Sequence, residues 1–94
     1  MKQVLLLCLC LLILPGTAKA ECFVSYKAKK DAPLRLHMGV LSLPAPCPAQ
    51  AKAEEQTAQR LAQAGWTLLT VLTLSMREPD DKTKADASAH YLRY

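Results

Sequence analysis

The sequence has few of the residues that build ligand sites. It holds 94 residues with two histidines and three glycines, and aromatic residues make up only 5% of it. It lacks the HExxH, HxH, GxSxG, SxxK and CxxC patterns that mark metal sites, serine nucleophiles and reactive thiol pairs. A chain of this size also has little room for both a core and a substrate cavity. We therefore expect no enzymatic activity, no metal and no cofactor.

The remaining polar candidates have simple structural interpretations. His37 and His90 lack a third ligand nearby, so we expect surface or rim histidines and no zinc site. The carboxylate pairs Glu54-Glu55 and Asp80-Asp81 are predicted to be solvated charge and not a general acid–base pair. The serines at positions 25, 42, 75 and 88 stand outside any nucleophile motif.

The N-terminus carries a long apolar run behind a basic residue. Lys2 precedes an apolar run from Val4 to Leu14, which is followed by Pro15-Gly16 and by Ala18-Lys19-Ala20. This order predicts a cleaved secretory signal peptide over residues 1–20. The eleven apolar residues are too few for a transmembrane helix, which needs about 20. We therefore expect no transmembrane anchor. Because leucine, and not a small residue, precedes both Cys8 and Cys10, we also expect no lipid anchor.

The mature chain, residues 21–94, is expected to form a single small α+β domain in the periplasm or outside the cell. Its ten Lys and Arg against eight Asp and Glu leave a charge of +2, too small to indicate nucleic-acid binding. Cys22 and Cys47 are its two cysteines, and in an exported chain each has one intramolecular partner. We expect a structural disulfide between them.

Two runs at the start of the mature chain alternate as half-buried strands do. Residues 22–30 and 34–40 are separated by the turn-forming cluster Asp31-Ala32-Pro33, which predicts an antiparallel hairpin. Residues 43–48 contain three prolines and are expected to be a stiff connector. Residues 49–64 are strong helix formers, with a modest apolar stripe at Ala51, Ala58, Leu61 and Ala62.

Gly65 and Trp66 predict how this helix ends. Gly65 suits the left-handed residue beyond the helix, and Trp66 and Leu61 are the pair that touches in a Schellman cap. The threonine-rich stretch 66–76 then predicts a central strand. Its alternation places Leu68, Leu72, Leu74 and Met76 on one face and Thr67, Leu69, Val71, Thr73 and Ser75 on the other.

Residues 78–87 are polar and predict an exposed loop, and residues 88–94 alternate as a last strand. The expected fold is therefore a two-layer β-β-α-β-β domain: a four-stranded, mainly antiparallel sheet with one helix on one face. The strand order stays open, and a mixed sheet with a helical crossover also fits this pattern.

The segments "LAQAGWTLLTVL…YLRY" and "YKAKKDAPLRLHMGV" resemble parts of small exported proteobacterial proteins without assigned activity. In those proteins a helix ends in Gly-Trp, a strand follows, and a short last strand ends in an aromatic and a basic residue. The similar segments cover about half of the mature chain. The resemblance implies a fold and a Gram-negative periplasm, and it brings no activity, cofactor or functional residue with it.

Two surfaces are candidates for binding. The first is a cationic face of the hairpin, where an anionic partner such as a lipid headgroup or acidic glycan would meet Lys27, Lys29, Arg35 and His37. The alternative is an ordinary solvated sheet face. The second is the sheet face that one helix leaves uncovered, where a protein partner or a second copy would meet Phe23, Leu41, Leu69 and Val71. The sequence thus predicts a non-catalytic binding or interaction module of the bacterial envelope.

Overall fold

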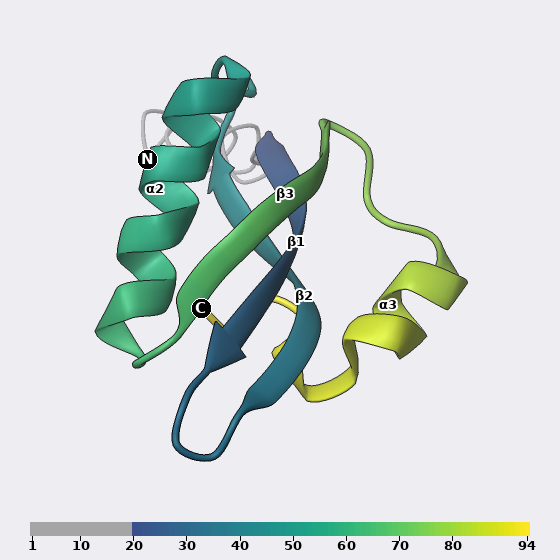
Figure 1. Ribbon diagram of the computed structural model, residues 1–94. Helices are drawn as coiled ribbons and strands as arrows, with labels where there is room; N and C mark the ends of the chain where they lie inside the picture. Colours follow the sequence, from purple (N-terminus) through teal and green to yellow (C-terminus); the bar gives the residue numbers. More distant parts are fainter. Residues whose placement is uncertain (1–19) are drawn as a thin grey trace, which may run out of the picture.

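The computed structural model describes residues 20–94, so nearly all of the predicted signal peptide lies outside the described residues. The chain is an α+β structure with one three-stranded antiparallel sheet in the order β2-β1-β3 (Figure 1). Its strands are β1 (Glu21–Lys30), β2 (Arg35–Pro44) and β3 (Thr67–Ser75). Its helices are α2 (Gln50–Gln63), α3 (Asp81–Ala87) and the 3-10 helix η2 (Ser88–His90).

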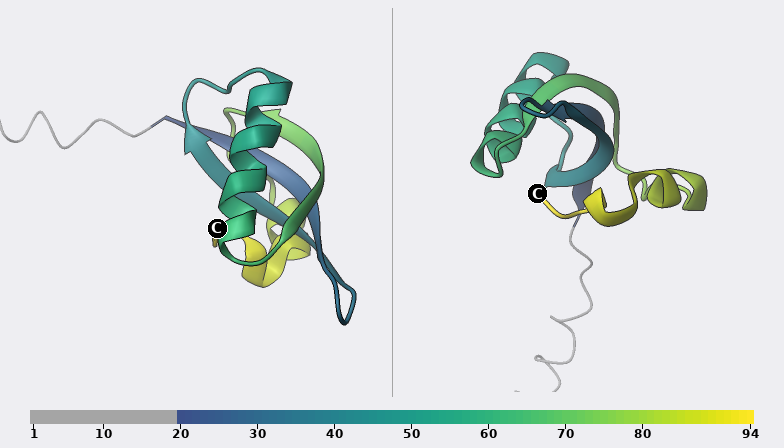
Figure 2. Two further views of the ribbon diagram at one scale, coloured as in Figure 1. Left: turned by 60° about the vertical axis from the view of Figure 1, so that its left-hand side comes forward. Right: turned by 60° about the horizontal axis from the view of Figure 1, so that its bottom comes forward.

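The main core lies between the sheet and α2, which covers one face (Figure 2). Every second residue of β1 points into it, as period-two alternation requires. Leu41 and Leu43 from β2 and Leu61 from α2 complete this layer. The fully buried side chains include those of Cys22, Val24, Tyr26 and Ala28 on β1.

The predicted cap at the end of α2 is confirmed. The Trp66 amide donates to the Leu61 carbonyl at 2.9 Å, and the Gly65 amide donates to the Ala62 carbonyl at 3.0 Å, which is the Schellman pattern. Gly65 has a φ of +83°, in the left-handed region. The cap directs the chain from α2 into β3 and places the indole of Trp66 against the core.

We expect Gly65→Ala to lower the free energy of unfolding by about 1 kcal/mol, because a Cβ is disfavoured at positive φ. Space is not the cause, since the nearest atom to an added Cβ would be the Lys30 Cε at 3.5 Å. Urea unfolding measures the change, and Ala64→Gly is a matched control one residue earlier, at a negative φ. An unchanged midpoint for Gly65→Ala would contradict the assignment.

The apolar stripe predicted for α2 is wrong except at Leu61. Ala53, Thr57 and Leu61, each four residues from the next, are the buried side chains. Ala51 and Ala62 are exposed and Ala58 is half-buried. A chain of alternating small and polar residues supports two neighbouring stripes almost equally, so composition alone did not separate them.

Leu68 and Leu74 of β3 face α2, as predicted. The faces predicted for Leu72 and Val71 are wrong, because the strand contains two irregularities. Its pairing with β1 shifts between Ser25 and Tyr26 and again between Lys27 and Ala28. Each shift leaves one β3 residue without a partner, first Leu72 and then Leu69. Residues three apart therefore share the face toward α2: Leu68, Val71 and Leu74.

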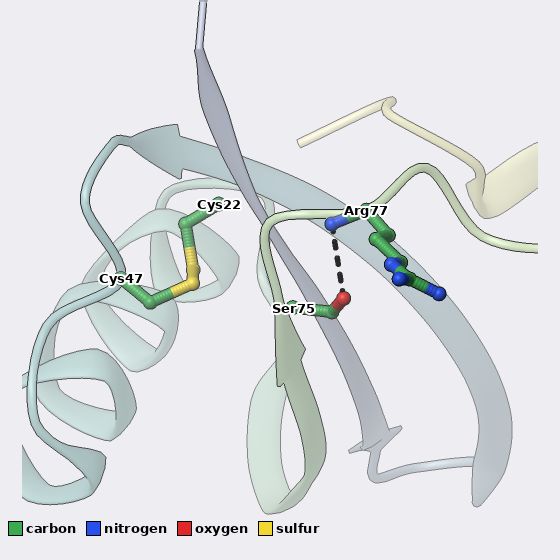
Figure 3. The surroundings of a disulfide bond; sticks show 4 residues. All are labelled: Cys22, Cys47, Ser75 and Arg77. Atoms are coloured by element: carbon green, nitrogen blue, oxygen red, sulfur yellow. Dashed lines mark hydrogen bonds between the residues drawn. A yellow bond between two sulfur atoms is a disulfide. The ribbon is translucent and has the colours of Figure 1, made fainter.

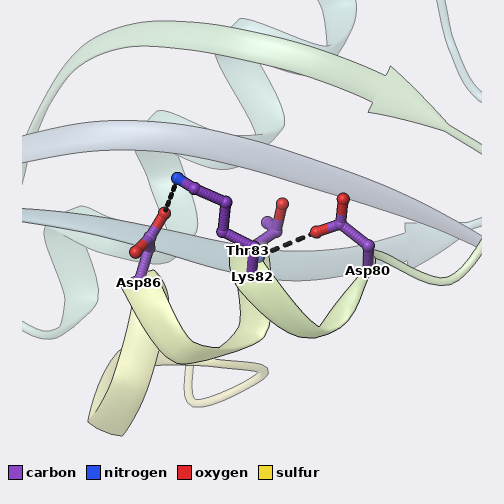
Figure 4. A network of polar contacts seen from close by, with 4 residues as sticks. All are labelled: Asp80, Lys82, Thr83 and Asp86. Atoms are coloured by element: carbon purple, nitrogen blue, oxygen red, sulfur yellow. Dashed lines mark hydrogen bonds and ion pairs between the residues drawn. The ribbon is translucent and has the colours of Figure 1, made fainter.

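The C-terminal region differs from the predicted loop and fourth strand. Residues 81–87 form α3, whose first turn is capped by the Asp80 carboxylate accepting from the Thr83 amide at 2.8 Å (Figure 4). Lys82 and Asp86 pair at 3.2 Å along the same helix. The predicted strand at 88–94 is wrong, since Ser88 and Leu92 have positive φ values that an extended strand does not adopt. A single parallel bridge joins Tyr91 to Val40.

The second helix changes the architecture of the sheet. α3 packs against β2 on the side away from α2, so helices lie on both faces of the sheet (Figure 2). Ser25, Val40 and Ala87 are buried in this region, outside the main core. The face predicted to be free is thus partly covered by the chain itself.

Candidate functional site

The disulfide between Cys22 and Cys47 is present, as predicted (Figure 3). It joins the start of β1 to the proline-rich connector that leads into α2. At the far margin of the sheet, the Ser75 hydroxyl accepts from the Arg77 amide at 3.0 Å where β3 ends. The disulfide holds the two layers together and lies away from the hairpin turn.

The predicted cationic row is divided between the two faces of the sheet. Paired residues of an antiparallel ladder share a face, and Lys27 and Lys29 pair with Met38 and Leu36. His37 pairs with Ala28, on the face toward α2. The turn sets this register: paired residue numbers sum to 65, an odd number, so odd residues of β1 share a face with even residues of β2.

The prediction that the four residues share one face is therefore wrong, and the lysines lie beside apolar side chains instead. Arg35 pairs with Lys30 at the hairpin end, on the same face as His37. Lys29 is partly neutralised by Asp31, whose carboxylate lies 3.3 Å from its Nζ. The register places Lys27 and Lys29 on one face of the sheet and Arg35 and His37 on the other.

The residues around the lysines form what we call the hairpin patch: Lys27, Lys29, Leu36, Met38 and Leu69. Four of them line a pocket of about 280 Å³, completed by Ala28 and His37. Leu36 is 66% exposed and Leu69 51% exposed. The length of the turn was the sequence signal that could have placed Leu36 and Met38 beside the lysines.

The four residues predicted to form a protein interface lie in different environments. Leu41 is fully buried and Val71 is 7% exposed, both in the main core, so the exposure predicted for them is wrong. Val71 turned inward because of the two irregularities in β3. Phe23 is half-buried, and Leu69 is the one exposed member of the set.

The two histidines form an unexpected cluster with three aromatic residues. Their rings stack with centroids 3.7 Å apart and planes inclined by 14°. The Tyr26 hydroxyl lies 2.9 Å from His37 Nε2, and the Tyr94 hydroxyl lies 3.0 Å from His90 Nδ1. Trp66 meets the His37 ring edge to face at 4.2 Å. We call these five residues the histidine cluster; it joins the C-terminal segment to β2 and to the cap of α2.

Burial lowers the pKa of both imidazoles. The pKa of His37 is lowered to about 4, mainly by loss of solvation and to a smaller extent by the nearby charges of His90 and Lys30. His37 Nδ1 is buried without a hydrogen-bond partner in the described chain, so a protonated ring would leave one N–H donor unpaired. The pKa of His90 is also lowered, first by burial and then by Arg93 and Lys30. Burial raises the pKa of Tyr26, and Tyr94 adds to this.

The lowered pKa makes stability depend on pH. Between the ordinary imidazole pKa of 6.5 and the value of about 4, the unfolded chain binds a proton at His37 that the folded chain does not. Above the ordinary pKa, His37 therefore costs the protein no stability. As the pH falls to the lowered pKa, the free energy of unfolding decreases, and below that value it decreases no further through this group. Because the ring is only partly buried, we expect a loss of about 1 to 2 kcal/mol. Urea unfolding across this range measures it; an equal pH dependence in His37→Gln would contradict the assignment.

Other polar candidates are dispersed through the structure. Asp80 caps α3, and the hydrogen bond from the Thr83 amide lowers its pKa. Glu54 and Glu55 lie exposed on α2, as predicted, and Ser42 Oγ donates to Glu21 at 3.1 Å. Within residues 20–94, no group of three or more His, Cys, Asp or Glu side chains is arranged to hold a metal ion. In the same range, no helix is long and apolar enough to cross a membrane.

No family model matches the chain, and no curated protein or solved structure is significantly similar to it. Its class is therefore defined by its own fold: a small, disulfide-stapled α+β structure with a three-stranded antiparallel sheet between two helices.

Proposed function

We propose that the protein is an exported, non-catalytic binding module of the bacterial envelope, whose hairpin patch binds the anionic headgroups of a lipid membrane. The observation that carries the proposal is the pair of exposed leucines, Leu36 and Leu69, beside Lys27 around one shallow pocket. Exposed apolar side chains next to cations suit a surface with negative headgroups above an apolar interior.

The shape of the hairpin supports the same proposal. Its turn extends away from the body of the structure (Figure 2, left). Leu34 in that turn is 64% exposed, and Lys30 and Arg35 flank it. The turn would enter the interfacial region while the disulfide stays above it, because the disulfide joins the other end of β1 to the connector. The membrane would be the one facing the compartment into which the signal peptide delivers the chain.

Vesicle co-sedimentation tests the proposal with phosphatidylglycerol vesicles and with zwitterionic phosphatidylcholine vesicles. We expect binding to the first and little to the second. Lys27→Gln should weaken binding about fivefold, since a basic residue near an anionic surface contributes about 1 kcal/mol. Leu36→Ser should weaken it about tenfold through lost apolar burial.

Matched controls are available on other surfaces. Lys52→Gln on α2 and Leu92→Ser near the C-terminus change an exposed lysine and an exposed leucine away from the hairpin. Both should bind as the unchanged protein does. Equal binding to both kinds of vesicle, or equal losses in the control variants, would refute the proposal. Binding to a soluble acidic glycan but not to vesicles would assign the patch to the glycan instead.

A further inference from the structure

The two edges of the sheet differ in whether another segment of the chain covers them. The β2 edge is partly covered by the C-terminal segment, where Tyr91 bridges to Val40 and the Leu92 amide donates to the Val40 carbonyl at 2.8 Å. β3 forms the opposite margin, and no described segment pairs with its outer side. Figure 2 (left) shows β3 as the outermost strand there. Its outward backbone N–H and C=O groups are therefore open to another strand.

The composition of β3 does not protect this open edge. Its nine residues, TLLTVLTLS, contain neither charge nor proline, the usual means of preventing strand addition. β2, in comparison, begins with Arg35 and ends with Pro44. The irregularities at Leu69 and Leu72 interrupt regular pairing along β3. They favour a short added strand over a long pairing of two β3 strands from two copies of the chain.

A groove lies along the first half of this strand. It has a volume of about 640 Å³ and runs between α2 and residues 66–70. The α2 wall consists of residues that recur every three or four positions and so lie on one side of the helix. Ala51, Ala58 and Ala62 are small and leave room above the strand, and Glu54 and Glu55 are the charged members of this wall.

The charge on the groove wall indicates the kind of occupant. Neither Glu54 nor Glu55 forms an ion pair within residues 20–94; Glu54 accepts only a hydrogen bond from the Gln50 side chain, at 3.2 Å. Two neighbouring carboxylates without a cation favour lysine or arginine in a ligand. The β3 side of the groove contributes no charge that would compete.

We propose that the groove between α2 and β3 binds an extended, lysine- or arginine-bearing segment of a partner protein, which adds to β3 as a short fourth strand. Main-chain hydrogen bonds to the open edge would provide affinity, and the alanine stripe and the two glutamates would select small and basic side chains. This site lies beside α2 and is separate from the hairpin patch, although Leu69 borders both.

NMR titration of the ¹⁵N-labelled, oxidised protein tests the proposal, with an acetylated peptide of alternating lysine and valine as the probe. The same peptide with glutamate in place of lysine is the matched control. We expect saturable shifts at residues 66–70 and along the α2 wall with the lysine peptide alone. Amide exchange at the outer edge of β3 should slow in the complex.

The double variant Glu54→Lys, Glu55→Lys should weaken binding at least about tenfold, because each favourable pair is replaced by a repulsion. Gln59→Lys, Gln63→Lys introduces the same two lysines elsewhere on α2, away from the groove, and should bind as the unchanged protein does. No shift with the lysine peptide, or shifts confined to the hairpin patch, would overturn the proposal. Concentration-dependent shifts at residues 66–70 without peptide would assign the groove to a second copy.

Vesicle binding distinguishes the two proposals. A protein that binds vesicles but not the peptide retains the hairpin assignment and loses the groove assignment. A protein that binds the peptide but not vesicles gives the reverse result. Neither set of variants changes a residue of the other surface, so each failure can be attributed to one site.

Discussion

Replacing Cys22 and Cys47 together by alanine is expected to lower the free energy of unfolding by about 3.5 kcal/mol. The disulfide closes a loop between residues 25 apart in sequence, and without it the unfolded chain gains the conformational freedom of that loop. A domain of this size commonly has a net stability of only about 5 kcal/mol. The loss therefore brings the protein close to unfolding at ambient temperature.

The loss has a structural consequence as well. Cys47 belongs to the connector between β2 and α2, and its bond to β1 fixes the connector against the edge of the core. In the double variant we expect the start of α2 to exchange its amides faster than β1 and β2 do. Thermal unfolding should shift downward by roughly 15 to 25 °C. The unchanged protein under a reducing agent is the matched comparison.

A decrease of less than 1 kcal/mol would contradict this account, whereas a similar decrease on reduction and on substitution would support it. Thiol titration of the exported, non-reduced protein adds an independent check. If residues 1–20 are removed on export, Cys8 and Cys10 leave with them, and no free thiol should be detected in the mature chain. Two free thiols would show that the segment is retained.

The local elements were largely predictable, because neighbouring residues determine them. The hairpin, α2, its Schellman cap and β3 follow from alternation, helix propensity and Gly65, and the structure confirms them. Their bounds agree within a residue or two, except that β2 continues to Pro44, into the predicted connector. The Cys22–Cys47 bond was predictable because residues 21–94 contain two cysteines, which allow one pairing. None of these inferences required knowledge of how distant segments meet.

The candidate sites were less predictable, because they depend on register. One residue in the length of the hairpin turn decides whether Lys27 shares a face with Met38 or with His37. The irregularities at Leu69 and Leu72 likewise decide that Val71 is buried. Strict alternation in the sequence cannot reveal an irregularity, since the extra residue has no special type.

The C-terminal segment shows a second limit of pattern analysis. Alternation at 88–94 fits a strand, but the positive φ values at Ser88 and Leu92 bend the chain so that His90 reaches His37. The contacts that hold this path, the ring stack and the bonds of residues 91 and 92 to Val40, join residues distant in sequence. The sequence shows the two histidines, but it does not show that their rings lie side by side in the fold.

Trp66→Ala is expected to lower the free energy of unfolding by about 3 to 5 kcal/mol. The indole is 9% exposed and belongs to the main core. It meets His37 at 4.2 Å, and the Lys30 ammonium lies 4.5 Å from its ring centre. Removing the indole leaves a cavity, removes the cation–π contact with Lys30 and weakens the end of the α2 cap. Three stabilising contributions are therefore lost together.

The same variant separates packing from electrostatics in the histidine cluster. Without the indole, water reaches the His37 ring, and the burial that lowers its pKa is relieved. NMR titration should then place the pKa of His37 closer to its ordinary value of 6.5, and the acid-dependent loss of stability should shrink. Trp66→Phe keeps an aromatic ring at the position and should retain most of the lowered pKa.

Leu72→Ala is the control for this measurement, because that leucine is exposed on the same strand and lies outside the core. It should change stability by less than about 0.5 kcal/mol and leave the titration of His37 unchanged. If Trp66→Ala unfolds the protein, the Trp66→Phe titration still decides the question. A His37 pKa that stays near 4 when the ring is exposed to solvent would mean that the charges of His90 and Lys30, and not burial, hold the imidazole neutral.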